Sequence, residues 1–203
     1  MHRLLDVLAS GVHDAKNQLF YAEAQIAAAE AAHGLDLAEA RYAIEAAAGR
    51  LSRTLAAYRL LRDEARLAVV PAVVADLCEE VALDQRKHLA RAGLTLDVAC
   101  TVRDEWALDR DLVADILNNA IQNASRHARS RIRLSAGEAD GSLCLRVEDD
   151  GCGFADTDPA AHGIGLLVAA RIAELHRRQE RHGSLRLCNG GEFGGAVLEL
   201  RLP

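Results

Sequence analysis

The 203-residue sequence is poor in aromatic side chains and carries no excess of positive charge. Only 3% of its residues are aromatic whereas 50% are hydrophobic, so its core must be built mainly from aliphatic side chains. This composition favours packed helices over a β-sandwich. The net charge of −6 leaves no basic surplus to neutralise phosphates, and we therefore expect no nucleic-acid partner.

Long apolar runs and paired cysteines are missing as well. No run approaches the roughly 18 residues that a membrane span needs, and the N-terminus lacks a signal-peptide pattern. The 5 cysteines show neither a CxxC pair nor zinc-ligand spacing, which is typical of reduced thiols in a cytosolic protein. We therefore expect a cytoplasmic protein without membrane insertion.

The first third of the chain predicts a helical hairpin. Apolar or small residues recur at alternating steps of three and four from Leu5 to Ala29, and a second such series runs from Leu37 to Ala65. Gly34 separates the two series, because Gly can adopt the left-handed conformation that ends a helix. So short a turn makes the helices antiparallel. A second copy of the chain would bury their remaining apolar surface in a dimeric four-helix bundle.

One histidine of this hairpin is a candidate for phosphoryl chemistry. His13 follows a residue of the apolar series, which places it on the flank expected to face solvent. Asp14 is its neighbour, and Asn17 follows one helical turn later. A carboxylate beside an exposed imidazole can orient the ring and hold the proton on the nitrogen that does not attack. Exposed histidines are common on helices, and without this motif the hairpin would fit a plain coiled-coil dimerisation module equally well.

The rest of the chain is predicted as an α+β domain. We place the boundary so that residues 1–66 form the hairpin and residues 67–203 the second domain. Helices are expected at 71–93, with Pro71 in the first turn, at 109–128, where Asp109 is the N-cap, and at 163–177. Strands are expected at 94–100, 131–136, 142–148, 183–188 and 196–202, and Asp140-Gly141 predicts a hairpin turn. The order favours a two-layer α/β sandwich with antiparallel strand pairs over a Rossmann sheet.

Two asparagines lie one turn apart on the second of these predicted helices, Asn119 and Asn123. Because Asn is a mediocre helix former, two aligned ones require an explanation. Their amide oxygens can ligate Mg²⁺ and accept hydrogen bonds from its waters, which suits a triphosphate site. A polar stripe facing solvent is the alternative interpretation.

Two glycine-rich segments follow. The first runs from Val147 to Phe154, where a strand ends in the acidic pair Asp149-Asp150 and two glycines let the backbone approach a ligand closely. An Asp at such a strand end can accept a hydrogen bond from the exocyclic amine of adenine, although a simple hairpin loop uses the same residue types. The second runs from His162 to Leu167 and opens a helix, whose unpaired N–H groups and positive dipole end suit phosphates.

In this order and spacing, the segments resemble the sequence boxes of the two-component histidine kinases, whose ATPase domain is shared with gyrase, Hsp90 and MutL. The resemblance covers nearly the whole chain, and His13 with Asp14 looks like the H box, in which the histidine is phosphorylated. For the ATP site, the resemblance implies an N box that contains Asn119 and Asn123, with Asn123 as the magnesium ligand and with Arg126 and His127 in its tail. It implies a first glycine box with Asp149, which would bind adenine, and with Gly151 and Gly153. It implies a second glycine box with Gly163, Gly165 and Leu166.

The chain departs from the family pattern in two places. Only seven residues separate Phe154 from His162, so the lid that closes over the γ-phosphate is very short, and no F box is present. The H box also lies at the start of the chain, and no sensor precedes it. Input is therefore expected from another protein.

Three hypotheses follow. In the first, the chain is a cytosolic, sensorless histidine kinase: His13 takes the γ-phosphoryl group of Mg·ATP, assisted by Asp14, and passes it to an aspartate of a response regulator receiver domain. Asn17 would position a water or the partner's carboxylate. In the second, the nucleotide site is weak or vestigial, and a homodimeric histidine phosphotransferase shuttles phosphate between receiver domains, supplied by an upstream sensor or hybrid kinase. In the third, the chain is a non-catalytic scaffold.

Overall fold

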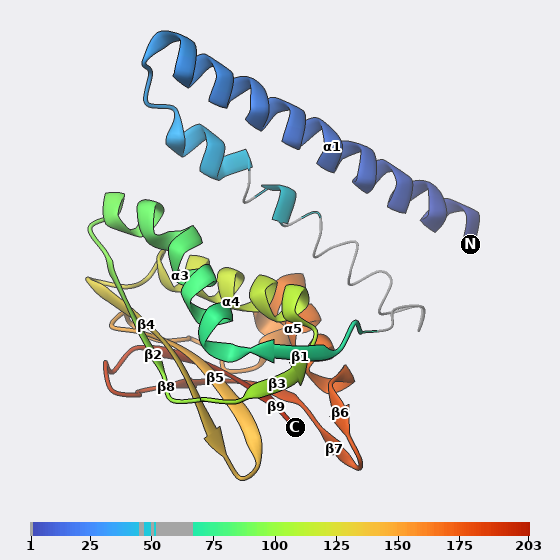
Figure 1. Cartoon of the computed structure of the whole chain (residues 1–203), viewed down its shortest axis with the longest axis vertical. Coiled ribbons are helices and arrows are strands. Elements are labelled where there is room, and N and C mark those ends of the chain that lie inside the picture. The colour runs from blue at the N-terminus through green and yellow to red at the C-terminus, as the bar shows by residue number, and fades with distance from the viewer. Residues whose placement is uncertain (1, 45–46, 50, 52–66) are drawn as a thin grey trace. The chain divides into compact units, whose positions relative to one another are not determined.

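The computed structural model describes residues 2–44, 47–49, 51 and 67–203 (Figure 1). The chain divides into two compact units, Met1–Ala65 and Arg66–Pro203, which are described separately.

The first unit begins with one long helix, α1 (His2–His33). Gly34 ends this helix with a φ of 63°, the left-handed conformation that the sequence predicts there. Its N–H donates a hydrogen bond to the carbonyl of Glu30 at 2.9 Å. The chain is helical again at residues 38–44, so the predicted helix–turn–helix order is present at this end of the unit.

Arg41 ties the two helical segments together beside the turn. Its guanidinium lies 3.3 Å from the carboxylate of Glu23 and 3.4 Å from that of Glu30, both on α1. These ion pairs hold the helical segment 38–44 beside α1, so the chain runs back along that helix. Much of the second predicted helix lies outside the described residues, and the four-helix bundle stays a prediction.

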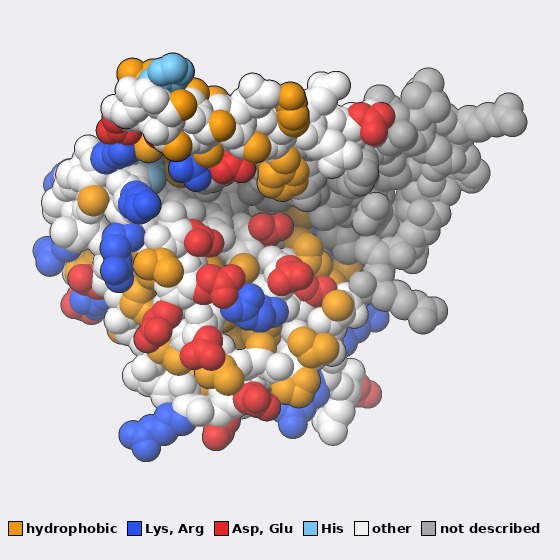
Figure 2. All heavy atoms as spheres, turned by 45° about the horizontal axis from the view of Figure 1, so that its top comes forward, with side chains coloured by type: hydrophobic (Ala, Val, Ile, Leu, Met, Phe, Trp, Pro, Cys, Tyr) orange, Lys and Arg blue, Asp and Glu red, His pale blue; other side chains and the backbone are white. Residues whose placement is uncertain are grey.

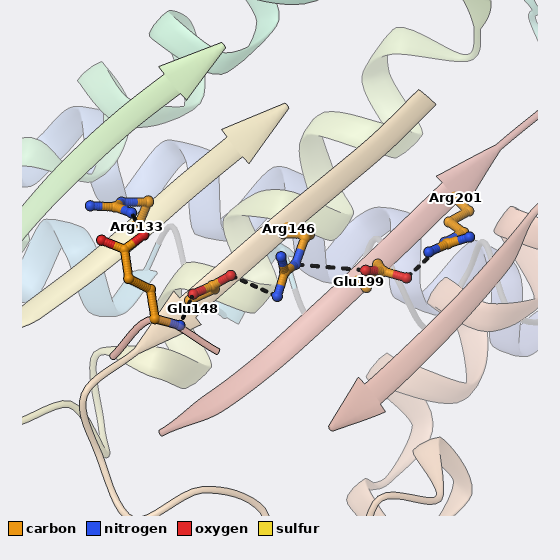
Figure 3. Close-up of polar contacts among 6 residues, drawn as sticks. Arg133, Arg146, Glu148, Glu199 and Arg201 are labelled. Carbon is orange, nitrogen blue, oxygen red and sulfur yellow. Dashed lines mark hydrogen bonds and ion pairs between the residues drawn. The ribbon is translucent and has the colours of Figure 1, made fainter. Parts of the chain in front are cut away.

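The second unit is a layer of helices packed on one face of a mixed five-stranded sheet (Figures 1 and 3). The strand order is β2-β4-β5-β9-β8, with β2 parallel to β4 and the other neighbours antiparallel. The strands are β2 (Thr95–Cys100), β4 (Arg131–Ala139), β5 (Ser142–Asp149), β8 (Ser184–Asn189) and β9 (Ala196–Leu202). The helices are α3 (Val74–Arg91), α4 (Arg110–Ala124), α5 (Ile164–Leu175) and the short 3-10 helix η1 (Pro159–His162). The predicted two-layer α/β arrangement is confirmed for this unit.

Strand β5 shows how the sheet separates its two faces. Leu143, Leu145 and Val147 are at most 3% exposed and pack toward the helices. The intervening Arg146 and Glu148 point to the opposite face, as the twofold alternation of a strand requires. There they join a row of ion pairs that crosses neighbouring strands (Figure 3): Glu148 to Arg146 at 2.8 Å, Arg146 to Glu199 at 3.6 Å, and Glu199 to Arg201 at 2.7 Å.

The hairpin between β4 and β5 turns at Asp140-Gly141, as predicted. Both residues have positive φ, 54° and 68°, which is the backbone of a two-residue turn that matches strand twist. The 5 cysteines of the chain all lie in this unit and are free thiols. On the face drawn in Figure 2, the described basic side chains are interspersed with acidic and hydrophobic ones.

The prediction that Pro71 opens a helix is wrong. Pro71 lies in strand β1 (Val70–Val73), which pairs with β3 (Glu105–Leu108) in a separate two-stranded sheet, and α3 starts only at Val74. A proline is tolerated in such an edge strand, where its missing N–H breaks no ladder. A second small ribbon, β6 (Arg177–Arg178) with β7 (Arg181–His182), was not predicted either.

Candidate functional site

A cavity of about 380 Å³ lies between α4, the loop after β5 and the start of α5. Its lining mixes a few polar groups with small and aliphatic side chains: Ala120, Asn123, Ala124, His127, Val147, Asp149, Cys152, Gly153, Phe154, Ala155, His162, Leu166, Ala196 and Leu198. Such a lining is typical of a small-molecule site. Five residues predicted from the sequence meet in it, namely Asn123, His127, Asp149, Gly153 and Leu166.

Helix α4 forms one wall. Asp109 caps its start, accepting a hydrogen bond from the N–H of Leu112 at 3.2 Å, as the sequence predicts. Leu117 and Ile121 are fully buried and anchor the helix in the core. Asn123 lies on the side of the helix that borders the cavity.

The two predicted asparagines have different surroundings. Asn123 lines the cavity, and its Oδ1 accepts a long hydrogen bond, 3.4 Å, from the guanidinium of Arg126 in the following turn. Asn119 is only 9% exposed and is not among the residues that line the cavity, and a Cβ on Gly165 would come within 3.3 Å of its Nδ2. Asn119 therefore packs against the second glycine segment, and Arg126 is exposed outside the lining.

Asp149 ends β5 with a buried carboxylate that is 3% exposed. Its Oδ1 accepts hydrogen bonds from the N–H groups of Gly151 at 2.8 Å and Ala196 at 3.2 Å. Two backbone donors from separate segments thus fix the orientation of the carboxylate at the cavity wall. The approach is close: a Cβ on Gly195 would lie 2.3 Å from the carbonyl oxygen of Asp149.

Gly151 does not line the cavity, but it lets two parts of the cavity wall meet. A Cβ at this position would come within 2.4 Å of the carbonyl oxygen of His127. Backbone cannot move aside as a flexible side chain can, so only glycine permits this contact. The end of α4 and the loop after β5 are therefore in direct backbone contact.

Asp150 fastens the same two parts of the wall. Its Oδ1 accepts from the N–H groups of Arg129 at 2.8 Å, Ser130 at 3.0 Å and Arg131 at 3.3 Å, and its Oδ2 from the hydroxyl of Ser130 at 2.6 Å. Burial alone would raise the pKa of Asp150, but the hydrogen bonds from Ser130, Arg129 and Arg131 outweigh it and hold that pKa well below its usual range. The second acidic residue of the loop is therefore structural.

The second glycine segment begins α5. Gly163 has a φ of 86° and stands at the N-cap, a conformation that favours glycine. Gly165 lies in the first turn, and Leu166 is 3% exposed and reaches the cavity. Gly163 and Gly165 lie outside the lining itself.

The short lid predicted from the sequence is a compact turn. Between Phe154 and His162 the chain forms η1, whose start is capped by Asp158, which accepts from the N–H of Ala160 at 2.9 Å. Phe154 and His162, at the two ends of the segment, both line the cavity.

The residues of the predicted H box lie in the first unit, within α1. Asp14 and Asn17 have exposed side chains, whereas the side chain of His13 lies outside those that the structure describes. None of the described helices combines the length and the apolar character needed to cross a membrane. In the described part of the chain, no three His, Cys, Asp or Glu side chains are grouped to hold a metal ion.

The apolar side of the cavity was not predicted. Val147 on β5 and Ala196 and Leu198 on β9 border it because these two strands are neighbours in the sheet. Their alternating pattern predicts inward-facing side chains, but a pattern along one strand does not say which residues of another strand lie beside it. Phe154 and His162 were predicted as the ends of the two glycine-rich segments and of the lid, but not as residues that line the cavity.

Comparisons with known proteins agree with this geometry. Residues 108–203 match the family "Histidine kinase-, DNA gyrase B-, and HSP90-like ATPase". The two-component sensor PhoQ of Pseudomonas aeruginosa is 30% identical over 156 residues, covering 70% of this chain and 32% of PhoQ. The signal transduction histidine-protein kinase AfsQ2 of Streptomyces coelicolor is 31% identical over 154 residues, covering 68% of this chain and 27% of AfsQ2. The chain thus spans about a third of the length of these curated relatives.

Solved structures show the same fold. Full-length ShkA, in complex with AMPPNP, superposes with a TM-score of 0.66 at 19% identity, covering 98% of this chain and 45% of ShkA. The ATP binding domain of PrrB from Mycobacterium tuberculosis has a TM-score of 0.52 at 28% identity, covering 66% of this chain and 96% of that domain. Residues 108–203 are therefore an ATPase domain of the histidine kinase type, and the chain contains a two-component histidine kinase core.

Proposed function

We propose that the chain binds Mg·ATP in the cavity beside α4 and transfers the γ-phosphoryl group to His13. The observation that carries this proposal is the convergence of Asn123, Asp149 and Leu166, from three separate predicted segments, on one cavity. The AMPPNP bound to ShkA and the ATP binding domain of PrrB lend support by similarity.

Asp149 would select the base. Both of its backbone hydrogen bonds go to Oδ1, so Oδ2 is the oxygen that we assign to the exocyclic amine of adenine. Ala120, Val147 and Leu198 supply apolar surface against which a flat purine can pack. A carboxylate held this way accepts from an amine but repels a carbonyl oxygen, so adenine is preferred over guanine.

The donor set fits a magnesium nucleotide. Mg²⁺ retains several waters and takes one or two protein ligands together with phosphate oxygens. The amide oxygen of Asn123 is a hard donor at the cavity wall, and its contact with Arg126 is long enough to be exchanged. When bound, the ion would neutralise charge on the phosphates.

His13 would act as the nucleophile. Its unprotonated ring nitrogen forms a bond to the γ-phosphorus while the bond to the bridging oxygen breaks, and ADP leaves with the electron pair. The other ring nitrogen becomes acidic, and its proton is accepted by Asp14. Asn17 would position the acceptor that follows, an aspartate of a response regulator receiver domain. The acting species is proposed to be a homodimer in the cytoplasm.

The test is a transfer of labelled phosphate. Purified chain is incubated with Mg²⁺ and γ-labelled ATP, and acid-labile, base-stable label is measured on wild type, on His13→Ala and on His33→Ala, whose exposed histidine lies in the same unit. The proposal expects label on wild type and on His33→Ala and none on His13→Ala. Absence of nucleotide binding, with label accepted by His13 from a phosphorylated receiver domain, would instead identify a phosphotransferase.

A further inference from the structure

Phe154, at the rim of the cavity, is held by a side chain from a distant strand. Its N–H donates to Oδ1 of Asn189 at 2.6 Å, and its carbonyl accepts from Nδ2 of the same side chain at 2.9 Å. Asn189 is the last residue of β8. One amide therefore satisfies both backbone groups of Phe154, much as a neighbouring strand would.

The residue before Phe154 makes this contact possible. Gly153 has a φ of 81°, and a Cβ there would lie 2.6 Å from Oδ1 of Asn189. The position therefore needs glycine both for its backbone conformation and for the approach of Asn189. Gly153 and Phe154 both line the cavity, so Asn189 acts on the cavity wall without lining it.

The far end of the lid segment folds back onto its start. The rings of His162 and Phe154 meet edge to face, with centroids 5.2 Å apart and an interplanar angle of 66°. Nε2 of His162 lies 2.5 Å from the carbonyl oxygen of Asp156, to which it donates when it carries the proton. Both ends of the segment are thus tied to each other, and one of them to β8.

We propose that Asn189, Phe154 and His162 form a latch that holds the short lid in place before nucleotide arrives. Asn189 is then a positioning residue, since it acts through the backbone of Phe154, whereas Phe154 and His162 contact the nucleotide. This inference rests on the proposed function because it assumes a nucleotide in the cavity. A lid that is already in place needs no ordering on binding, which spares the entropy that a long mobile lid loses.

Substitution of Asn189 tests the latch in the full-length chain. Asn189→Ala removes both bonds to Phe154, and the Kd for Mg·ATP is expected to rise about tenfold. Glu192→Ala, in the same turn between β8 and β9, removes an exposed side chain that pairs with Arg133 and is expected to leave this Kd unchanged. In autophosphorylation, Asn189→Ala should raise KM for ATP while kcat stays within about twofold.

A merely structural role for Asn189 gives a different result. In that case Asn189→Ala lowers the melting temperature but leaves the Kd for Mg·ATP as in wild type, and the latch is refuted. His162→Ala is a second route, because His162 is exposed and its loss removes the ring contact to Phe154 and the bond to Asp156 without touching Asn189. It too should weaken Mg·ATP binding, by about threefold, and because His162 also contacts the nucleotide, it supports the latch only if the lid amides exchange faster without nucleotide as well.

Amide hydrogen exchange of residues 155–162 reports the lid directly. The latch predicts protection that is nearly the same with and without Mg·ATP in wild type, and reduced in Asn189→Ala without nucleotide. Protection that appears only when Mg·ATP is bound would overturn the latch while leaving the proposed function intact. Failure of wild type to bind Mg·ATP at all would instead refute the proposed function.

Discussion

The two walls of the cavity are built in different ways. The wall from α4 is a regular helix, whose own backbone bonds and buried Leu117 and Ile121 hold it in place. The wall from the loop after β5 has no regular structure around Gly153 and depends on single polar side chains, Asp150 and Asn189. We infer that the helical wall determines stability, whereas the loop wall determines how well a ligand is held.

A cavity in the core behind the helical wall should have the largest effect. Leu117→Ala removes a fully buried side chain and is expected to lower the free energy of unfolding by about 3 kcal/mol, measured by urea denaturation. A loss below about 1 kcal/mol would mean that α4 is not anchored as described.

The contact between the two walls is tested at Gly151. Gly151→Ala places a Cβ against the carbonyl oxygen of His127 and should cost about 2 kcal/mol, together with most of the affinity for Mg·ATP. Gly11→Ala is a chemical control, since Gly11 lies in α1 and, among the described residues, its added Cβ meets nothing within 4 Å beyond its chain neighbours and the backbone of its own helix. There the same change should stabilise the helix slightly. If Gly151→Ala and Gly11→Ala changed the free energy of unfolding by the same small amount, the two walls would not be in contact at Gly151.

Loss of the Asp150 carboxylate should cost less. Asp150→Ala leaves the N–H groups of residues 129–131 to water and is expected to lower stability by roughly 1.5 kcal/mol, with Asp150→Asn losing less because it keeps one acceptor.

The same carboxylate predicts a pH dependence. Its pKa in the folded chain lies below the ordinary value of 3.8, so its contribution is complete above about pH 4 and is lost as the pH falls through the folded pKa. The difference in stability between wild type and Asp150→Asn should therefore narrow in acid. If this difference in stability stayed constant down to the acid transition, the carboxylate of Asp150 would not be the stabilising group.

The smallest effect concerns His176, which joins α5 to the start of α4. Its Nε2 accepts from the N–H of Asp109 at 3.0 Å and its Nδ1 donates to the carbonyl of Ile172 at 2.9 Å, so the folded ring is neutral. Burial lowers the pKa of His176 below the ordinary 6.5. Because the unfolded chain then binds the proton more readily, stability should fall as the pH drops below 6.5, by at most about 1.4 kcal/mol per pH unit. His176→Leu should make the free energy of unfolding depend less on pH in this range. If the dependence were unchanged, His176 would not be the group whose protonation destabilises the folded chain.

The helical wall was largely predictable from the sequence and the loop wall was not. Asp109 as a cap and Asn123 on the same helix follow from local rules, because a helix repeats its geometry from one turn to the next. Gly151 and Gly153 were predicted to let the backbone approach a ligand closely, whereas their close neighbours in the structure are the protein groups of His127 and Asn189, which depend on tertiary packing. The residue that holds Phe154 is thirty-five positions away, and no spacing rule reaches it.

The prediction of strands from the sequence was limited in the same way, because local patterns do not contain tertiary partners. The strands β5 and β9 were predicted to within one residue at each end, because each alternates over at least seven positions, whereas β4 was predicted to end at residue 136 and continues to Ala139. The four-residue strands β1 and β3 carry too few alternations to be recognised, and their pairing brings Pro71 into a sheet. Short elements are stabilised by their partners, which a local pattern does not contain.

The most direct test of the account is the binding of Mg·ATP to wild type and to Asp149→Asn, measured by calorimetry. The asparagine can keep the Oδ1 bonds to Gly151 and Ala196 but turns a donor toward the adenine amine. We predict that wild type binds Mg·ATP in preference to Mg·GTP and that Asp149→Asn folds normally but loses at least about 1.4 kcal/mol, a factor of ten in Kd. Equal affinity of the two proteins for Mg·ATP, or no binding by wild type, would contradict the assignment of this cavity as the nucleotide site.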